Sequence, residues 1–274
     1  MLSQIALQRP KLANRALVQR RWREMKLPLS AALFFASALL LQAEWSVTKT
    51  EPLPAPAALQ VSRLSVNGSA GRAELHVVSF SPKAATFAVM DDPAGDFTLA
   101  TAAQKRGALA AVNGGYFHPD RTPLGLVVRQ GAQLHPLERS RLLSGMLVVR
   151  DGRIALQRVA EFKPSAAVRE AMQAGPFLVD AGKPVAGLNN SRAAARTVVF
   201  SDSAGSFGLL ICRYATLAET AEILLTPGVL PRGKIVRALN LDGGSSTGLW
   251  VQGEPPLYLR EGKDVRNYVA VVPR

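Results

Sequence analysis

Two glycine pairs, each following a polar side chain at the end of an apolar run, are the residues best suited to chemistry. They lie in AAVNGGYF at 110–117 and in ALNLDGGSST at 238–247. Paired glycines permit positive φ and let consecutive backbone N–H groups converge on an oxyanion. If the two apolar runs are neighbouring strands, Asn113, Asp242 and Ser245 share one pocket at a sheet edge. The alternative is two tight turns, because Asn-Gly and Asp-Gly are common in hairpins.

Other catalytic patterns do not fit the chain. The segment 244–248 matches the G-x-S-x-G pattern of a nucleophilic serine, but no histidine follows it and 249–251 reads as a strand, whereas that pattern requires a helix. Neither a P-loop nor a strand followed by G-x-G-x-x-G is present, so no nucleotide site is expected. Cys212 is the one cysteine and the three histidines are dispersed, which excludes a disulfide framework and a local zinc motif.

The net charge of +13 raises the question of a nucleic-acid or membrane partner. Residues 1–43 carry +6 of this charge, and the remaining +7 is scattered without a Lys/Arg run. No nucleic-acid partner is therefore expected. A polyanion-binding surface stays open as an alternative.

The N-terminal part has the pattern of a targeting segment. Residues 27–43 are uncharged, strongly apolar and preceded by cations. This pattern predicts a signal peptide cleaved near Ala43, or an uncleaved anchor with its N-terminus in the cytoplasm. Translation from Met25 instead of Met1 would give a signal peptide of ordinary length. We expect an exported, periplasmic or extracellular protein that contacts the membrane only through residues 1–43.

Residues 44–58 contain Pro52, Pro54 and Pro56 among alanines, which predicts an extended linker before a folded domain over 59–274. Short apolar runs bounded by turn residues predict the strands of this domain. They lie near 60–66, 73–80, 84–90, 108–112, 125–129, 146–150, 177–180, 197–201, 207–213, 235–241, 247–251 and 268–272.

Helix signals occur at two places. Thr216 and Glu219 form a capping box for a helix that must end before Pro227, and Thr98 begins a helix that Gly107 ends. Asn67-Gly68 predicts a hairpin between the first two strands. The pattern is typical of a single α+β domain of mixed β-sheets with a few helices, preceded by the signal or anchor segment.

Four motifs in order resemble the phosphodiester glycosidase family: AAVNGGYF (110–117), QAGPFLV (173–179), ARTVVF (195–200) and ALNLDGGSST (238–247). The resemblance covers roughly 59–272. It implies hydrolysis of a sugar-1-phosphodiester at the anomeric carbon, which releases the sugar and a phosphomonoester. His118 stands where an acidic residue is expected after the first motif.

This chemistry suits a site with one carboxylate. The leaving phosphomonoester has a second pKa of about 6, so it departs as an anion with little help from an acid. Most glycosidases use two carboxylates, but here one carboxylate and a cation on the phosphate suffice. The resemblance assigns Asp242 as nucleophile, as the base that activates water or as a metal ligand, and Arg196 as the phosphate clamp.

The resemblance also implies the residues that bind substrate, namely Asn113, Gly114, Gly115, Tyr116, Asn240, Gly243, Gly244, Ser245 and Ser246. Tyr116 stacks on the sugar or belongs to the core. His118 and Asp120 are candidates for acid–base chemistry or metal binding, and Asn267 matches a family position. No cofactor is required, although a divalent metal such as calcium would suit the Asp242 carboxylate.

These expectations predict an exported hydrolase of glycosyl-1-phosphodiesters in cell-envelope glycans or glycolipids. The alternative is a non-catalytic module that binds an envelope glycan or a polyanion through the same residues. The sequence specifies no oligomeric state.

Overall fold

Strands are the main regular structure of the described chain, which covers residues 45–69 and 71–274 of this computed structural model. The expected signal or anchor segment, residues 1–43, lies outside the described residues. Within them, no helix is both long enough and apolar enough to cross a membrane.

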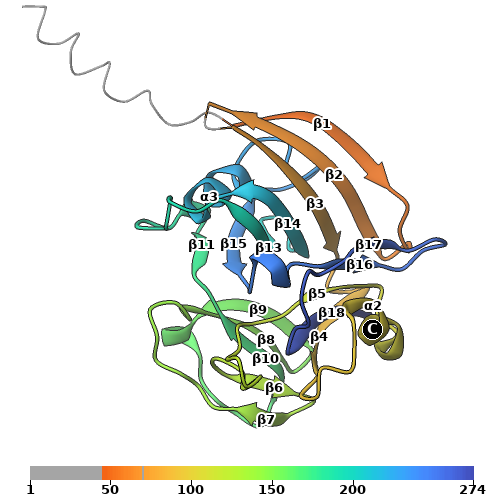
Figure 1. The fold of residues 1–274 in the computed structure, drawn as a ribbon, viewed down its shortest axis with the longest axis vertical. Helices are drawn as coiled ribbons and strands as arrows, with labels where there is room; N and C mark the ends of the chain where they lie inside the picture. Colours follow the sequence, from red (N-terminus) through yellow and green to blue (C-terminus); the bar gives the residue numbers. More distant parts are fainter. Residues whose placement is uncertain (1–44, 70) are drawn as a thin grey trace, which may run out of the picture. The chain divides into compact units, whose positions relative to one another are not determined.

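The strands form three sheets (Figure 1). The large sheet has the order β1 (Ser46–Leu53), β2 (Leu59–Gly68), β3 (Gly71–Phe80), β14 (Phe207–Ala215), β13 (Ala194–Asp202), β15 (Ile235–Asn240), β11 (Phe177–Asp180) and β12 (Lys183–Pro184). The β10 sheet has the order β7 (Ala132–His135), β6 (Val127–Arg129), β10 (Val168–Ala174), β8 (Gly145–Arg150) and β9 (Arg153–Arg158). The β5 sheet has the order β17 (Leu257–Leu259), β16 (Leu249–Val251), β5 (Ala110–Asn113), β18 (Asn267–Pro273) and β4 (Ala85–Asp91).

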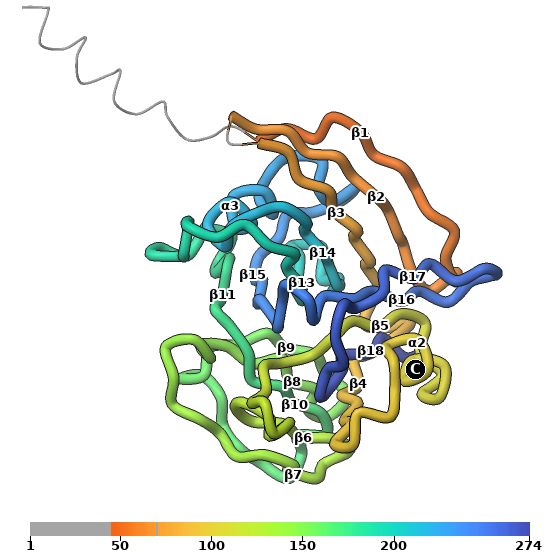
Figure 2. The backbone as a smooth tube through the Cα atoms, in the orientation of Figure 1, coloured from red at the N-terminus to blue at the C-terminus, as the bar shows by residue number. Residues whose placement is uncertain are grey.

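Sequence-distant strands lie side by side in this arrangement. Figure 2 shows β18, close to the C-terminus, running between β4 and β5. Every strand pairing in the described part of the chain is antiparallel, so the expectation of mixed sheets is wrong. The few helices present do not serve as crossovers between parallel neighbours, which is the connection that a parallel pair requires.

The segment expected to be a free linker belongs to the large sheet. Ser46–Leu53 pairs with β2 from Ser46↔Asn67 to Leu53↔Val61, so the sheet begins well before Leu59. Three of its first five residues, Val47, Thr48 and Thr50, are β-branched and favour a strand. Pro52 is tolerated because β1 is an edge strand, where a missing N–H costs no ladder bond.

One apolar core joins the three sheets. It combines Val78 and Leu209 of the large sheet with Leu147 of the β10 sheet and Val112 and Val269 of the β5 sheet. Helices cover the outer faces of two sheets. The helix α3 (Leu217–Leu224) packs on the large sheet, and α2 (Leu99–Arg106) packs on the β5 sheet. The short 3₁₀ turns are η2 (Val159–Glu161) and η3 (Gly244–Ser246).

Both predicted helix signals are confirmed. Thr216 accepts a bond from the Glu219 N–H while the Glu219 side chain accepts one from the Thr216 N–H. Thr98 caps α2, and Gly107 ends it at a positive φ of 65°. The predicted hairpin also forms, with Asn67↔Arg72 and Gly68↔Gly71 as its last pairs, so Asn67-Gly68 ends β2 and the turn follows it.

Candidate active site

The two glycine pairs lie in loops that contact each other. We call Asn113–Phe117 the first glycine loop and Asp242–Thr247 the second glycine loop. The Asp242 N–H donates to the Gly114 carbonyl at 3.0 Å, and the Asn113 side-chain amide donates to the Asp242 carbonyl at 2.7 Å. The strands before them, β5 and β15, belong to different sheets, so the expectation of one shared sheet edge is wrong. The loops meet because the common core holds the sheets together.

Asn113 holds the loops in place and has no free group for a ligand. It is 1% exposed, and its Oδ1 accepts bonds from the Thr197 hydroxyl at 2.7 Å and from the Gly248 N–H at 3.2 Å. With its amide nitrogen bound to Asp242, both ends of the side chain are used. The expectation that Asn113 binds substrate is therefore corrected, and Asn113 is a positioning residue.

The backbone N–H groups of the glycines are also engaged within the protein. Gly114 donates to the Asn267 carbonyl at 2.8 Å and Gly115 to Asn267 Oδ1 at 2.7 Å. The Gly243 N–H donates to Oδ1 of Asp242 at 2.8 Å. Each of these three amides therefore already has an acceptor within the protein, and the binding of phosphate or sugar hydroxyls by the Gly114 and Gly115 amides stays a prediction.

The glycines are required by close approach more than by backbone conformation. Among the four, only Gly244 has a positive φ, 64°. A Cβ on Gly114 would lie 2.1 Å from Asn267 Oδ1, and a Cβ on Gly243 would lie 2.8 Å from the Ala195 carbonyl. The second glycine loop therefore packs directly on the backbone of β13 beside Arg196.

Asp242 presents a fixed, half-buried carboxylate. Its Oδ1 accepts the Gly243 N–H, and its Oδ2 accepts the hydroxyl of Ser246, which is fully buried. The turn η3 brings Ser246 back toward the carboxylate that precedes it. Two bonds leave lone pairs free, since an ionised carboxylate offers about four acceptor positions.

Tyr116 lies close to this carboxylate. Its hydroxyl donates to the Gly175 carbonyl at 2.7 Å and accepts from the Asn240 amide at 2.9 Å. Burial, and secondarily the charge of Asp242, raises the pKa of Tyr116 above its usual range. The phenol therefore stays protonated at neutral pH. Asn240 is 2% exposed and buried beneath it, so Asn240 positions Tyr116 and does not reach a ligand itself.

Arg196 is a half-buried cation without a carboxylate partner among the described residues. Its Nε donates to the Ala215 carbonyl at 3.2 Å and its Nη2 to the Arg192 carbonyl at 2.6 Å. Burial lowers the pKa of Arg196, and the Tyr116 phenol acts on it in the opposite direction. Tyr116 is thus within electrostatic range of both Arg196 and Asp242. No ion pair joins Asp242 and Arg196 among the described residues, although the loop that carries Asp242 packs on the backbone beside Arg196.

The remaining residues predicted to bind substrate or metal differ in their exposure to solvent. Ser245 is exposed, Gly244 is half-buried, and the Gly262 N–H donates to the Ser245 carbonyl at 2.7 Å. His118 and Asp120 are exposed in a surface turn, where Asp120 accepts the Thr122 N–H at 2.9 Å. No contact joins that turn to Asp242 in the part of the chain that the structure describes.

The donor set around Asp242 does not fit a calcium cage. Calcium takes about six to eight oxygen ligands, commonly from several carboxylates. The partners of the Asp242 carboxylate are an amide N–H and a hydroxyl. Within residues 45–69 and 71–274, no group of three or more His, Cys, Asp or Glu side chains could hold a metal ion.

Two residues that hold the glycine loops in place, Thr197 and Asn267, have only weak signals in the sequence. Thr197 follows Arg196 directly and binds Asn113 through its hydroxyl. Asn267 begins β18 and holds both amides of the first glycine pair, while its buried Nδ2 has no partner among the described residues. The motif ARTVVF contained Thr197, but its role depends on a contact with another sheet.

Three solved structures share this fold. A hypothetical protein from Synechocystis is 18% identical, with a TM-score of 0.59, over 85% of this chain and 68% of that chain. The zebrafish N-acetylglucosamine-1-phosphodiester alpha-N-acetylglucosaminidase catalytic domain, auto-inhibited by its pro-peptide, is 15% identical, with a TM-score of 0.61, over 82% and 88%. A Burkholderia pseudomallei protein named as an exported protein is 14% identical, with a TM-score of 0.54, over 77% and 74%.

The family match agrees with the resemblance of the four motifs. No curated protein sequence gives a significant match. The family model described as phosphodiester glycosidase matches residues 106–272, which is more than half of the chain and includes both glycine loops and β13. The chain therefore belongs to the phosphodiester glycosidase family.

Proposed function

We propose that the protein is an exported hydrolase that cleaves the sugar–phosphate bond of glycosyl-1-phosphodiesters in cell-envelope glycans or glycolipids. Family membership supports a hydrolase of this kind. Export is supported by the apolar pattern of residues 27–43 and by the name of the Burkholderia structural relative.

The reaction needs one group at the anomeric carbon and another at the phosphate. Asp242 acts at the anomeric carbon, as nucleophile or as the base that activates water. Its two bonds from Gly243 and Ser246 fix the carboxylate orientation before substrate binds. Such preorganisation lowers the barrier because the groups need not rearrange during the reaction.

Arg196 binds the phosphate. Two of its nitrogens are held by backbone carbonyls, and Nη1 has no acceptor among the described residues. A held guanidinium offers a planar pair of donors that matches two phosphate oxygens. As the C–O bond at the anomeric carbon breaks, the phosphate gains negative charge, which this cation stabilises. Water supplies the new anomeric hydroxyl, and the phosphomonoester leaves with the bridging oxygen.

Tyr116 and Ser245 contact the sugar. Tyr116 is half-buried, and because its hydroxyl is bonded to Gly175 and Asn240, its ring is the part that contacts the sugar. Ser245 is exposed at the mouth of the site.

The observation that carries this proposal is the half-buried Arg196, which has no carboxylate partner among the described residues and lies on the strand against which the second glycine loop packs. A half-buried cation without a carboxylate is costly unless it receives an anion. The residue after Asp242 contacts the backbone of Arg196, since a Cβ on Gly243 would lie 3.9 Å from the Arg196 Cα, so an anion on Arg196 would lie near the second glycine loop. This arrangement fits a phosphodiester better than a neutral glycoside.

Release of free sugar from a panel of sugar-1-phosphodiesters, in both anomeric configurations, tests the proposal. We expect turnover by the wild type, and losses of about 10³-fold or more in Asp242→Asn and about 10²-fold in Arg196→Ala. Arg213→Ala, which removes an exposed cation on the adjacent strand, is the matched control and should keep full activity.

A parallel arm separates hydrolysis from binding and from metal dependence. Each assay is repeated with a chelator, and each substrate is also titrated by calorimetry. Substrate binding without any sugar release would overturn the hydrolase and favour the glycan-binding module. Full activity in Asp242→Asn or Arg196→Ala would refute the site.

A further inference from the structure

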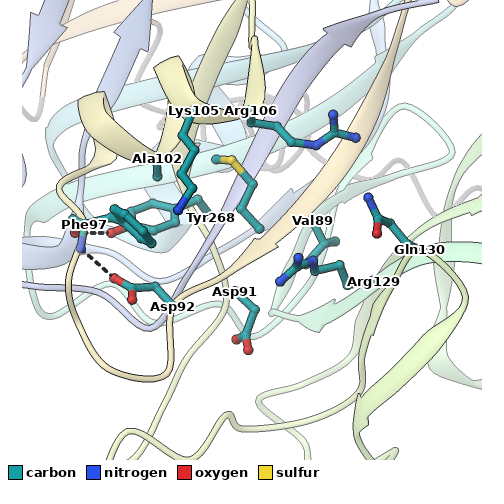
Figure 3. A pocket seen from close by; sticks show the side chains of 11 residues that line it. Val89, Asp91, Asp92, Phe97, Ala102, Lys105, Arg106, Arg129, Gln130 and Tyr268 are labelled. Atoms are coloured by element: carbon teal, nitrogen blue, oxygen red, sulfur yellow. Dashed lines mark hydrogen bonds between the residues drawn. The ribbon is translucent and has the colours of Figure 1, made fainter.

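A cavity lies apart from the candidate active site, and Asp242, Arg196 and Tyr116 do not line it. It has a volume of about 300 Å³ and is bounded by the end of α2, the end of β4 and the turn between β6 and β7 (Figure 3). Three cations line it: Lys105, Arg106 and Arg129.

These cations are exposed and have no acidic partner among the described residues. They come from separate elements, because Lys105 and Arg106 end α2 and Arg129 ends β6. In Figure 3, Lys105 extends over the rings of Phe97 and Tyr268, and Arg129 extends from its strand toward the cavity. The Lys105 ammonium lies 4.5 Å from the centre of the Phe97 ring.

The two acids that line the cavity, Asp91 and Asp92, are already hydrogen-bonded to groups around them. Asp91 forms two bonds with the Arg266 guanidinium, at 2.8 and 2.9 Å. Asp92 is 3% exposed, and its carboxylate accepts three backbone N–H groups at 3.0 to 3.1 Å, from residues 95–97. The charge left facing the cavity is therefore positive.

We propose that this cavity is a binding site for a phosphomonoester carried on a small carbohydrate. A phosphomonoester has a charge of about −1.5 to −2 at pH 7 and three acceptor oxygens. That matches two guanidiniums and an ammonium better than a monocarboxylate does. A concave surface lined by positive charges focuses its electrostatic field and therefore attracts such an anion.

The cavity also has surface for the carbon part of the ligand. Phe97 is half-buried and lies beside Lys105, so a ring attached to the phosphate would contact an aromatic face. Gln130, at the tip of the β6–β7 turn, adds a side-chain amide for a hydroxyl. This proposal is independent of the hydrolase reaction at Asp242.

Calorimetric titration of glucose 6-phosphate into the full Arg196→Ala protein tests this site without the phosphate clamp of the active site. We expect one bound ligand per chain, affinity that falls with added salt, and no binding of glucose. Lys105→Ala and Arg129→Ala should each weaken binding about tenfold, the loss expected for one charged hydrogen bond. Inorganic phosphate should bind with the same dependence on both residues and with lower affinity.

Arg72→Ala is the matched control, because it removes an exposed cation on β3 outside the cavity. Its affinity should stay within about twofold of the parent. Lys105, Arg129 and Arg72 are exposed, so their replacement should leave the thermal unfolding midpoint of the parent protein unchanged. Equal weakening in Arg72→Ala, equal binding of glucose, or no binding of either phosphate compound would overturn the proposal.

Discussion

Replacing Gly114 with alanine tests whether close packing between the glycine loops positions the Asp242 carboxylate. The new Cβ would lie 2.1 Å from Asn267 Oδ1 and 2.9 Å from the Asn267 carbonyl, whereas ordinary contact begins at 3.4 Å. The Asn267 amide must then move by more than an ångström, which breaks its 2.7 Å bond from the Gly115 N–H. Overpacking costs about 1–3 kcal/mol and the lost bond about 1 kcal/mol, so we expect a loss of about 2–4 kcal/mol.

Urea unfolding of wild type and Gly114→Ala measures this loss, and sugar release measures its effect on the site. Activity should fall as well, because the Gly114 carbonyl accepts the Asp242 N–H. Gly115→Ala is the matched control, since its Cβ would meet nothing closer than the Gln173 carbonyl at 3.3 Å. A Gly114→Ala loss below about 0.5 kcal/mol, or one no larger than that of Gly115→Ala, would refute the packing argument.

Two further predictions concern single buried groups. Ser246→Ala removes the hydroxyl that holds Asp242 Oδ2, so kcat for sugar release should fall about tenfold and the free energy of unfolding should fall by about 1 kcal/mol; an unchanged kcat would contradict this role. Glu170 is buried between β4 and the β6–β7 turn, and burial raises its pKa above the usual 4.5. Its contribution to stability is complete below that pH and is lost as the pH rises through the raised value. The unfolding free energy of wild type minus that of Glu170→Gln should therefore decrease from about pH 4 to about pH 7, and a difference independent of pH would count against it.

Sequence signals that act within a few residues were sufficient to predict the helices and the apolar strands. The capping box at Thr216 and the stop at Gly107 act within a few residues, so the sequence pattern alone defines them. β10 was not predicted, because its sequence contains several polar residues and lacks the apolar pattern expected of a strand that is almost fully buried. Gln173 is accommodated there only because the Leu126 and Glu138 N–H groups, from elsewhere in the chain, donate to its side chain.

The catalytic roles of Asp242 and Arg196 stay predictions, whereas the hydrogen bonding of the candidate site could not be predicted from the sequence. Asp242 and Arg196 stand out as the polar members of apolar motifs. That the glycine N–H groups are already bonded depends on Asn267, which lies more than 150 residues later and reaches the first glycine loop through strand pairing with β5. The sequence shows which groups can donate, whereas the fold decides which donors remain free for a ligand.

A crystal structure of Asp242→Asn with an uncleaved sugar-1-phosphodiester measures the central claim most directly. We expect the phosphate on the Arg196 guanidinium and the anomeric carbon next to the side chain of residue 242, with Tyr116 between them. A ligand whose phosphate lies away from Arg196, or whose anomeric carbon points away from residue 242, would contradict the account.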